Sequence, residues 1–426
     1  MNMHVPSSLT AFALMLAFVL GSAAPLTANA ASSSSKREKE KKETSAKLEV
    51  SGWIPYWRTE AGTKDAKAHL SQLTEVNPFG YTVKSDGSLN DAANINSKAW
   101  QDLFKEAKAK KVRVVPTVMW SDTNAIHATL SDPSKRAAHV KAIVKAVKDN
   151  GFDGIDIDYE GKKAETRPYF SAFLKELAAE FKKDKANKWL MCTIEARMPL
   201  EARFVGTPPP NIEYANDFKE INTHCDRVRV MTYDQQTADV QLNAAARAAK
   251  EPYAPVADVA WVEKVVNYMA KDIDKKKMVI GIATYGYIYQ LMPNTDGSGY
   301  GYIKTEAFNP GYATDIAAKY GITPTRNRAG ELSLTYVPKE QTALLPNQGF
   351  LAALAPKGTL SGNLAAAGAL ALAKSKKQQA PVQLLWWSDA KAIGDKVALA
   401  KKLKVAGVAV FKFDGGSDPA MWNYLK

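Results

Sequence analysis

The chain has few of the residues on which nucleophile–base and metal mechanisms depend. Its 426 residues include only five histidines, and these are scattered along the sequence. A local Ser–His motif or histidine metal motif therefore finds no support, and no spacing of cysteine and histidine fits a zinc site. We expect neither a metal nor a cofactor. The histidines are His4, His69, His127, His139 and His224.

Cysteine is almost absent as well. Cys192 and Cys225 are the only two, and each lies in or beside an apolar pattern that is typical of a strand. We interpret them as two buried thiols, and a single disulfide is the alternative.

The N-terminal apolar run, residues 9–20, is shorter than the ~20 residues that a membrane-spanning helix needs. The small residues ANA at 28–30 follow it at the spacing of a cleavage site. This pattern predicts a signal peptide over residues 1–30, and a secreted or cell-wall-associated protein without stable membrane insertion. Residues 31–47, ASSSSKREKEKKETSAK, are rich in serine and then in charge, which predicts a disordered linker.

Acidic residues are in the minority. The 44 Asp and Glu stand against 57 Lys and Arg, which leaves a formal net charge of +13. Such a balance favours polyanionic partners: nucleic acid, anionic wall polymers or membrane surfaces. Because no cluster of basic and aromatic residues indicates a nucleic-acid reader, we expect no nucleic-acid binding and rank the cell wall first. A strongly salt-dependent affinity for DNA would reverse that ranking.

Short β-branched, apolar runs alternate with amphipathic stretches over most of the chain. Helical patterns such as 97–110, 134–149, 165–184 and 259–272 separate them. Eight strands that alternate with helices predict an α/β fold, a (β/α)₈ TIM barrel over residues 48–426. The predicted strands are 48–57, 76–83, 112–120, 153–160, 189–196, 226–234, 278–286 and 405–413.

The interval between the seventh and eighth predicted strands is too long for one crossover helix. Residues from about 287 to 388 hold Gly- and Tyr-rich turns, a helical pattern at 311–320 and a strand pattern at 331–337. We therefore predict an inserted α+β module between strands 7 and 8. The Ala-rich segment 350–374 can be read as a helix or as a mobile lid.

The stretch GFDGIDIDYEG, residues 151–161, places four carboxylates among apolar residues. Alternate side chains of a strand share a face, so Asp156, Asp158 and Glu160 point the same way, into the barrel and toward its C-terminal mouth. Same-face neighbours lie about 6.6 Å apart, so repulsion and desolvation should raise at least one carboxyl pKa. Glu160 would then be a general acid, and Asp156 and Asp158 could share a proton below it.

Two other interpretations of this stretch have less support. Asp156, Asp158 and Glu160 imitate the first half of an EF-hand loop, but the twelfth position is Arg167 instead of Glu. A buried acidic network without catalysis is the second, and it would be costly without a use.

The pattern D-x-x-D-x-D-x-E, formed by Asp153, Asp156, Asp158 and Glu160, resembles the signature of glycoside hydrolase family 18, the chitinase-like barrels. A second motif of that family, M-x-Y-D, is matched by residues 231–234. GIATYG, residues 281–286, is similar to the family's pattern on the seventh strand, and residues 386–411 resemble its approach to the eighth. The resemblance covers about residues 48–426.

Two departures from the family pattern stand out. PTVMW, residues 116–120, replaces S-x-G-G on the third strand, and Phe411 stands where a tryptophan commonly floors the sugar site. With WIPYW and VNPFGYTV, the first departure resembles the bacterial branch that includes spore-cortex and cell-wall lytic enzymes. Phe411 would keep a smaller apolar platform.

The resemblance implies roles for the motif residues. Glu160 would protonate the leaving oxygen, Asp158 would accept the acetamido N–H of the substrate, and Asp156 would tune Asp158. Tyr233 would donate to the acetamide, while Asp153 would be structural. Glu195 and Arg197 could line the cleft or form a local ion pair. Substrate contacts are expected from Met231, Asp234, Tyr285, Trp53, Tyr81, Trp120, Phe411 and Trp386, although aromatics near barrel strands are as often core residues.

Asp158 and Glu160 share one strand and cannot straddle a sugar ring, so the implied nucleophile is the substrate's own acetamide. The expected function is secreted hydrolysis of β-1,4 bonds next to N-acetylglucosamine. The expected partner is an N-acetylated polysaccharide, peptidoglycan or chitin, bound by a monomer. The alternative is a non-catalytic, lectin-like barrel, against which Glu160, Asp158 and Tyr233 argue.

Overall fold

The computed structural model describes residues 47–183, 188–338 and 364–425. The predicted signal peptide and all but the last residue of the predicted linker lie outside these residues. Within the described ranges, no helix is both long and apolar enough to cross a membrane. Residues Leu48–Lys426 make one compact unit.

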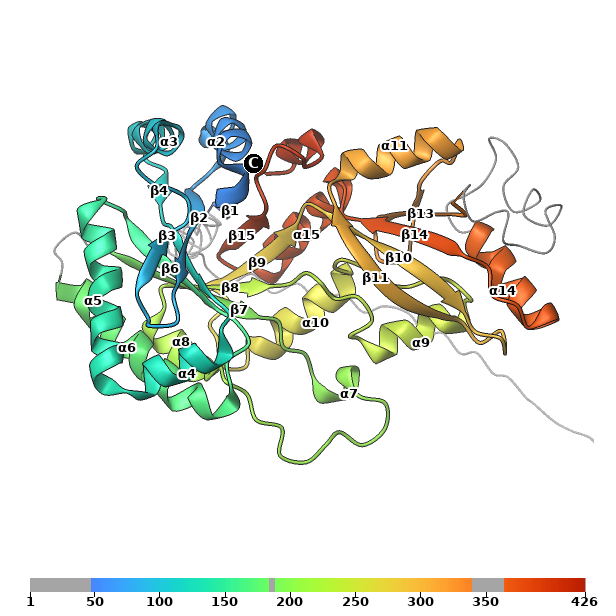
Figure 1. Cartoon of the computed structure of the whole chain (residues 1–426), viewed down its shortest axis with the longest axis horizontal. Coiled ribbons are helices and arrows are strands. Elements are labelled where there is room, and N and C mark those ends of the chain that lie inside the picture. The colour runs from blue at the N-terminus through green and yellow to red at the C-terminus, as the bar shows by residue number, and fades with distance from the viewer. Residues whose placement is uncertain (1–46, 184–187, 339–363, 426) are drawn as a thin grey trace, which may run out of the picture. The chain divides into compact units, whose positions relative to one another are not determined.

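Eight parallel strands form a closed barrel in that unit (Figure 1), in the order β1-β15-β9-β8-β7-β6-β5-β2. The first strand pairs with both the last and the second, so the barrel closes without an edge. The predicted TIM barrel is confirmed. The strands are β1 (Glu49–Pro55), β2 (Glu75–Val83), β5 (Thr117–Trp120), β6 (Gly154–Tyr159), β7 (Trp189–Glu195), β8 (Arg227–Met231), β9 (Met278–Ala283) and β15 (Gly407–Phe411).

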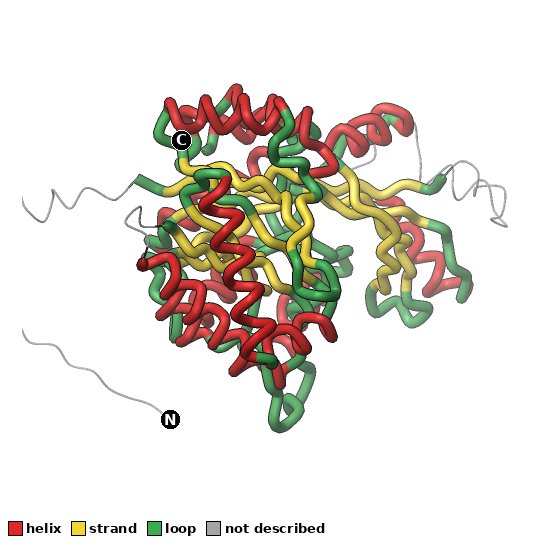
Figure 2. The backbone as a smooth tube through the Cα atoms, turned by 60° about the vertical axis from the view of Figure 1, so that its left-hand side comes forward, coloured by secondary structure: helices red, strands yellow, loops and turns green. Residues whose placement is uncertain are grey.

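Helices surround the strands in Figure 2 because each has one apolar stripe to bury. In α3 the buried residues Trp100, Leu103 and Ala107 recur at three- and four-residue spacing. Asp132 caps α5 by accepting from the backbone of Ser134 and Lys135. The helices are α2 (Thr59–Ala68), α3 (Lys98–Ala109), α4 (Thr123–Ser131), α5 (Pro133–Asp149), α6 (Arg167–Lys183), α7 (Leu200–Arg203), α8 (Phe218–His224), α9 (Val240–Ala248), α10 (Val259–Met269) and α15 (Ala390–Leu403).

Between β9 and β15, where the sequence predicts an insertion, lies an antiparallel five-stranded sheet of order β11-β10-β14-β13-β12. Of the Ala-rich segment 350–374, residues 364–374 are helical and the remainder lies outside the described residues. The elements are β10 (Gly286–Pro293), β11 (Tyr300–Phe308), α11 (Pro310–Tyr320), β12 (Thr325–Arg326), β13 (Leu332–Tyr336), α14 (Leu364–Lys376) and β14 (Val382–Trp387); β3 (Leu89–Asp91) and β4 (Arg113–Val114) are short strands beside β2.

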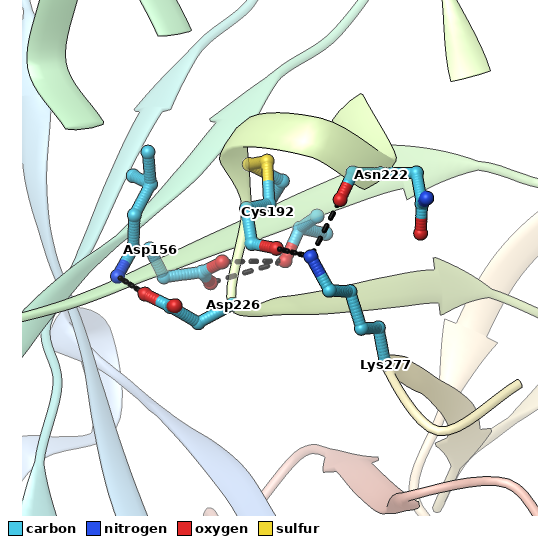
Figure 3. Close-up of a disulfide and its surroundings, with 8 residues drawn as sticks. Asp156, Cys192, Asn222, Asp226 and Lys277 are labelled. Atoms are coloured by element: carbon cyan, nitrogen blue, oxygen red, sulfur yellow. Dashed lines mark hydrogen bonds between the residues drawn. A yellow bond between two sulfur atoms is a disulfide. The ribbon is translucent and has the colours of Figure 1, made fainter. Parts of the chain in front are cut away.

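A disulfide joins Cys192 of β7 to Cys225, which follows α8 (Figure 3). Our interpretation of two free thiols was therefore wrong. The side chain of Asp226 accepts from the backbone of Leu190, and the Cα atoms of the two cysteines lie 6.0 Å apart. Lys277 donates to the carbonyl of Cys225 from the other side. Cys225 lies between α8 and β8, the strand that pairs with β7, and the separation along the chain does not reveal this proximity.

Candidate active site

The side chains of β6 alternate between two faces of the strand, as the sequence pattern predicts. Ile155, Ile157 and Tyr159 pack in the large hydrophobic core beneath the helices. Asp156 and Asp158 lie on the opposite face and are buried. Glu160 follows the strand directly, is partly exposed and lines a cavity of about 560 Å³ at the barrel mouth.

Asp156 is surrounded by donors from four other barrel strands, of which two, β5 and β7, pair with β6. One of its oxygens accepts from Trp53 Nε1 at 3.2 Å and from Thr117 at 2.8 Å, and Thr193 donates to both of its oxygens. A charged pair with Arg229, 2.8 Å, completes the set. These contacts give both carboxylate oxygens of Asp156 a partner in the barrel interior.

Asp158 has the opposite surroundings. It is buried, and its Oδ1 has no hydrogen-bond partner among the described residues. Burial, followed by the charges of Glu160 and Asp156, raises its pKa well above the usual aspartate range. The proton sharing expected between Asp156 and Asp158 stays a prediction.

Glu160 also favours its protonated form. Burial raises its pKa, the charges of Glu195 and Asp234 raise it further, and the ammonium of Lys162 opposes the shift. Lys162 donates to the carbonyl of Tyr159 and lies 4.6 Å from the ring centre of Phe170. A carboxylic acid whose pKa is raised and which faces a cavity can act as a general acid.

Tyr233 follows β8 and reaches the same cavity. Its ring stacks on Phe411, with centroids 5.9 Å apart. Burial raises the pKa of its phenol, as do the nearby carboxylates, Asp158 first, so Tyr233 remains a hydrogen-bond donor. A Cβ at Gly281 would come within 2.6 Å of the Val230 carbonyl oxygen and 2.9 Å of the Tyr233 ring, so this position of β9 has no room for a side chain.

Asp234 connects the two parts of the barrel mouth. Its carboxylate accepts from the hydroxyls of Tyr285 and Tyr287, each at 2.7 Å. It lines the 560 Å³ cavity together with Glu160, Met231 and Tyr233. It also lines a second cavity of about 420 Å³ beside Tyr285 and Phe411. A chain-like substrate that lies across Asp234 would therefore occupy both cavities.

Four predicted contact residues lie elsewhere. Trp53 is buried below the site, where its indole binds Asp156. Tyr81 and Trp120 belong to the hydrophobic core, and the Trp120 ring packs edge-on against Tyr159. Trp386 lies in the inserted module and donates to the buried Glu331. None of the four lines a described cavity, because their indole and phenol rings complete apolar packing instead.

The predicted structural residue Asp153 accepts from the backbone of Val114 at 2.8 Å and so ties β6 to β4. Glu195 and Arg197 do line the larger cavity, but no ion pair joins them in the described ranges. Glu195 accepts from the backbone of Gly161 and from Asn216, and Arg197 stacks on Tyr214.

Three residues of the site were not identified from the sequence. Lys162 lies two positions after Glu160, and Tyr287 lies two after Tyr285. Arg229 precedes Met231 by two positions and so shares its inward face. The period of two was the available signal for all three. No group of histidine, cysteine or carboxylate side chains in the described residues could hold a metal ion.

Comparisons with known proteins agree with this geometry. The sequence profile of the family "Glycosyl hydrolases family 18" matches residues 52–416. The curated glycosylase YvbX of Bacillus subtilis, described as uncharacterized, is 21% identical over 306 residues, which are 72% of this chain and 70% of the relative.

Solved structures share the fold. The spore cortex-lytic enzyme SleL of Bacillus cereus matches with a TM-score of 0.62 and 17% identity, over 89% of this chain and 73% of that one. A class V chitinase of Pseudomonas fluorescens Pf-5 matches with a TM-score of 0.64 and 22% identity, over 89% and 98% of the two chains.

Proposed function

The chain belongs to family 18 of the glycosyl hydrolases, and we propose that it cleaves β-1,4 bonds next to N-acetylglucosamine with retention of configuration, using the substrate's acetamide as nucleophile. The observation that carries this proposal is the pair Asp158 and Glu160. Both rise from one strand beside Tyr233, and Asp158 Oδ1 is buried without a partner in the described residues.

In the first step, the acetamido oxygen of the bound sugar attacks the anomeric carbon. Glu160 gives its proton to the glycosidic oxygen, and the leaving chain departs. The new bond makes a cyclic oxazolinium ion. Asp158 accepts the acetamido N–H and stabilises the positive charge, while the phenol of Tyr233 donates to the acetamide and holds it in place.

In the second step, water attacks the anomeric carbon from the side that the leaving chain has vacated. Glu160, now a carboxylate, takes the proton of this water and returns to its acid form. The bond between the anomeric carbon and the acetamido oxygen breaks, which restores the acetamide. Two inversions give net retention.

The sugar ring in the reacting position would lie against Phe411. This ring is partly exposed, lines the smaller cavity and is supported by Trp53 and Tyr233 at centroid distances of 5.9 Å. Apolar sugar faces stack on aromatic rings, and a phenyl ring offers less area than an indole. Asp234, which is held by two tyrosines, would accept from a sugar hydroxyl.

For the substrate we propose peptidoglycan glycan before chitin, and a secreted or wall-associated location. The net charge of +13 favours an anionic matrix, and the N-terminal sequence has the pattern of a secretory signal. The larger cavity adds the cations Lys162, Arg197 and Arg203 to its carboxylates. Peptidoglycan carries carboxylates on its lactyl and peptide groups, whereas chitin carries none.

Mass spectrometry of the products from purified peptidoglycan and colloidal chitin tests the proposal. Products with a reducing N-acetylglucosamine end from peptidoglycan would support it, and chitobiose alone would redirect it to chitin. Glu160→Gln should abolish both. Glu165→Gln is the matched control, because this carboxylate is exposed and lines no described cavity. Tight glycan binding without any product that depends on Glu160 would favour the lectin.

A further inference from the structure

The two cavities that meet at Asp234 divide the proposed substrate between them. The reacting sugar would lie against Phe411, which lines the smaller cavity. Glu160 lines the larger cavity and not the smaller one. Because a general acid must reach the oxygen that joins the reacting sugar to the leaving sugar, the leaving sugar would occupy the larger cavity, about 560 Å³.

Peptidoglycan and chitin place different sugars in that cavity. Peptidoglycan alternates N-acetylglucosamine with N-acetylmuramic acid, so cleavage after N-acetylglucosamine makes muramic acid the leaving sugar. In chitin the leaving sugar is another N-acetylglucosamine. The two differ by one group, the lactyl ether on O3, which ends in a carboxylate or, where a stem peptide is attached, in an amide oxygen. A cavity wall that selects muramic acid must offer a donor to that oxygen.

Arg197 offers donors of this kind. It follows β7, is partly buried and lines the larger cavity. Its guanidinium carbon lies 3.7 Å from the ring centre of Tyr214 and 3.9 Å from that of Phe218, and these rings hold its plane. Among the described residues it forms no ion pair and donates one hydrogen bond, to the carbonyl of Asn216 at 3.2 Å. Most of its N–H groups therefore have no partner in the described part of the chain.

The other cations that line this cavity differ from Arg197. Lys162 donates to a backbone carbonyl of β6 and lowers the pKa of Glu160, so its charge acts on the catalytic acid. Arg203 is exposed and can complete its hydrogen bonds with solvent. The carboxylate of Glu195 accepts from two neutral donors instead of pairing with Arg197. Arg197 is thus the partly desolvated cation of this wall that lacks a counter-ion in the described residues.

Two neighbours of Arg197 also have unused hydrogen-bonding capacity. The hydroxyl of Tyr214 and the side-chain oxygen of Asn216 are buried and have no partner in the described ranges. Both residues line the larger cavity. Buried polar atoms of folded proteins are nearly always paired. Incomplete pairing at three residues of one wall indicates polar groups that a ligand or solvent completes.

We propose that Arg197 is the specificity-determining residue of the leaving-group side, where its guanidinium donates to the lactyl carboxyl oxygens of muramic acid. The planar guanidinium can give a carboxylate two parallel N–H bonds, and it can give one bond to the amide oxygen of a unit that carries a stem peptide. This inference rests on the function proposed above, since it requires cleavage after N-acetylglucosamine with Glu160 as the acid.

The test compares two substrates in Arg197→Gln: peptidoglycan strands freed of stem peptides by an amidase, and chitin oligosaccharides of similar length. Loss of a hydrogen bond between charged groups should lower kcat/KM on the strands about tenfold or more. On the oligosaccharides kcat/KM should stay within about twofold of the wild-type value, because they lack the lactyl group. Equal losses on the two substrates, or no loss on the strands, would overturn the proposal.

Two comparisons sharpen this test. Peptidoglycan that retains its stem peptides should show a smaller loss in Arg197→Gln, because an amide oxygen is a neutral acceptor. Arg203→Gln is the matched control, since it removes the same charge from the same cavity at an exposed position. This variant should keep the wild-type preference between strands and oligosaccharides. The same loss of preference in both variants would indicate diffuse attraction to a cationic wall and contradict the proposal.

A second readout depends neither on hydrolysis nor on the folding of Arg197→Gln. In an NMR titration of wild-type protein labelled with ¹⁵N at arginine, a disaccharide with muramic acid at its non-reducing end should shift the Nε–H signal of Arg197. A disaccharide of N-acetylglucosamine should leave that signal unchanged, and Arg197→Lys assigns it.

The two readouts separate the inference from the function on which it rests. If the wild type cleaves no N-acetylated glycan, the proposed function fails, while the titration still decides whether Arg197 binds the lactyl group. If the wild type cleaves chitin oligosaccharides but no peptidoglycan strand, the hydrolytic function holds and the inference fails. An Arg197 signal that responds equally to both disaccharides, or to neither, would also refute the inference alone.

Discussion

Removal of the disulfide between Cys192 and Cys225 is the most quantitative test of the fold. The two cysteines are 33 positions apart, so the bond closes a loop that holds the end of β7 and the whole of α8. In the chain-entropy account, a loop of this length raises the free energy of unfolding by about 3.7 kcal/mol at 25 °C.

This free energy converts to a shift in melting temperature. For a cooperative unit that spans Leu48–Lys426, an unfolding entropy of about 2.1 cal/mol/K per residue gives about 0.8 kcal/mol/K. The expected loss is therefore about 5 °C. Replacing both cysteines with alanine also removes buried packing. The double variant should therefore melt at or below the temperature expected for loss of the disulfide alone.

Calorimetry of three samples checks this expectation. The oxidised wild type should melt highest, the wild type reduced in denaturant and refolded with reductant about 5 °C lower, and the double variant should not respond to reductant. Alkylation after denaturation without reductant should label neither cysteine. Two labelled cysteines, or a reduced wild type that melts within 1 °C of the oxidised one, would show that the bond is absent or carries no stability.

Three further predictions concern the barrel mouth. Because the pKa of Asp158 is raised, its stability contribution is full below the ordinary aspartate pKa and is lost as pH rises toward the raised value. Asp158→Asn should therefore melt above the wild type at pH 8 and by a smaller margin at pH 4 in calorimetry; equal margins would contradict this. Lys162→Met removes the cation that lowers the pKa of Glu160, so the basic limb of kcat/KM against pH should move to higher pH. An unchanged or more acidic limb would exclude that coupling. Tyr287→Phe deletes one of two bonds to Asp234 and should lower kcat/KM about tenfold, the effect of about 1.5 kcal/mol for a bond to a charged group. Tyr289→Phe, two positions further along β10, makes no bond to Asp234 in the described residues and should leave kcat/KM near the wild-type value.

The barrel fold and the inward-facing carboxylates Asp156 and Asp158 could be predicted because both follow from periodic patterns in the sequence. Each of the eight predicted strands overlaps a barrel strand, since alternation of apolar and other residues indicates directly which face a side chain takes. The same period places Asp156 and Asp158 inside and Tyr159 outside, as observed. These predictions needed only the local sequence and the known arrangement of strands and helices in a (β/α)₈ barrel.

The roles of aromatic residues could not be predicted in this way. Trp120 and Phe411 both end barrel strands, yet Trp120 packs outward against Tyr159 and Phe411 faces the cavity. Which face an aromatic ring takes at the end of a short strand depends on register and twist. The disulfide joins β7 to the residue that follows α8, and the contact of Arg229 with Asp156 joins β8 to β6, which β7 separates. These residues are far apart in sequence, and only the barrel order brings them together.

The closing pair of the barrel joins the two ends of the folded unit. Glu49 of β1 lies opposite Gly407 of β15. During synthesis, β1 can therefore pair with its second neighbour only after almost the entire chain has been made. Until then β1 and β9 are open edges, which bind other chains readily. Phe411 belongs to the same last strand, and from there it lines the smaller cavity beside Asp234. A barrel without β15 lacks this wall of the site, so we expect activity during refolding to recover only with ring closure.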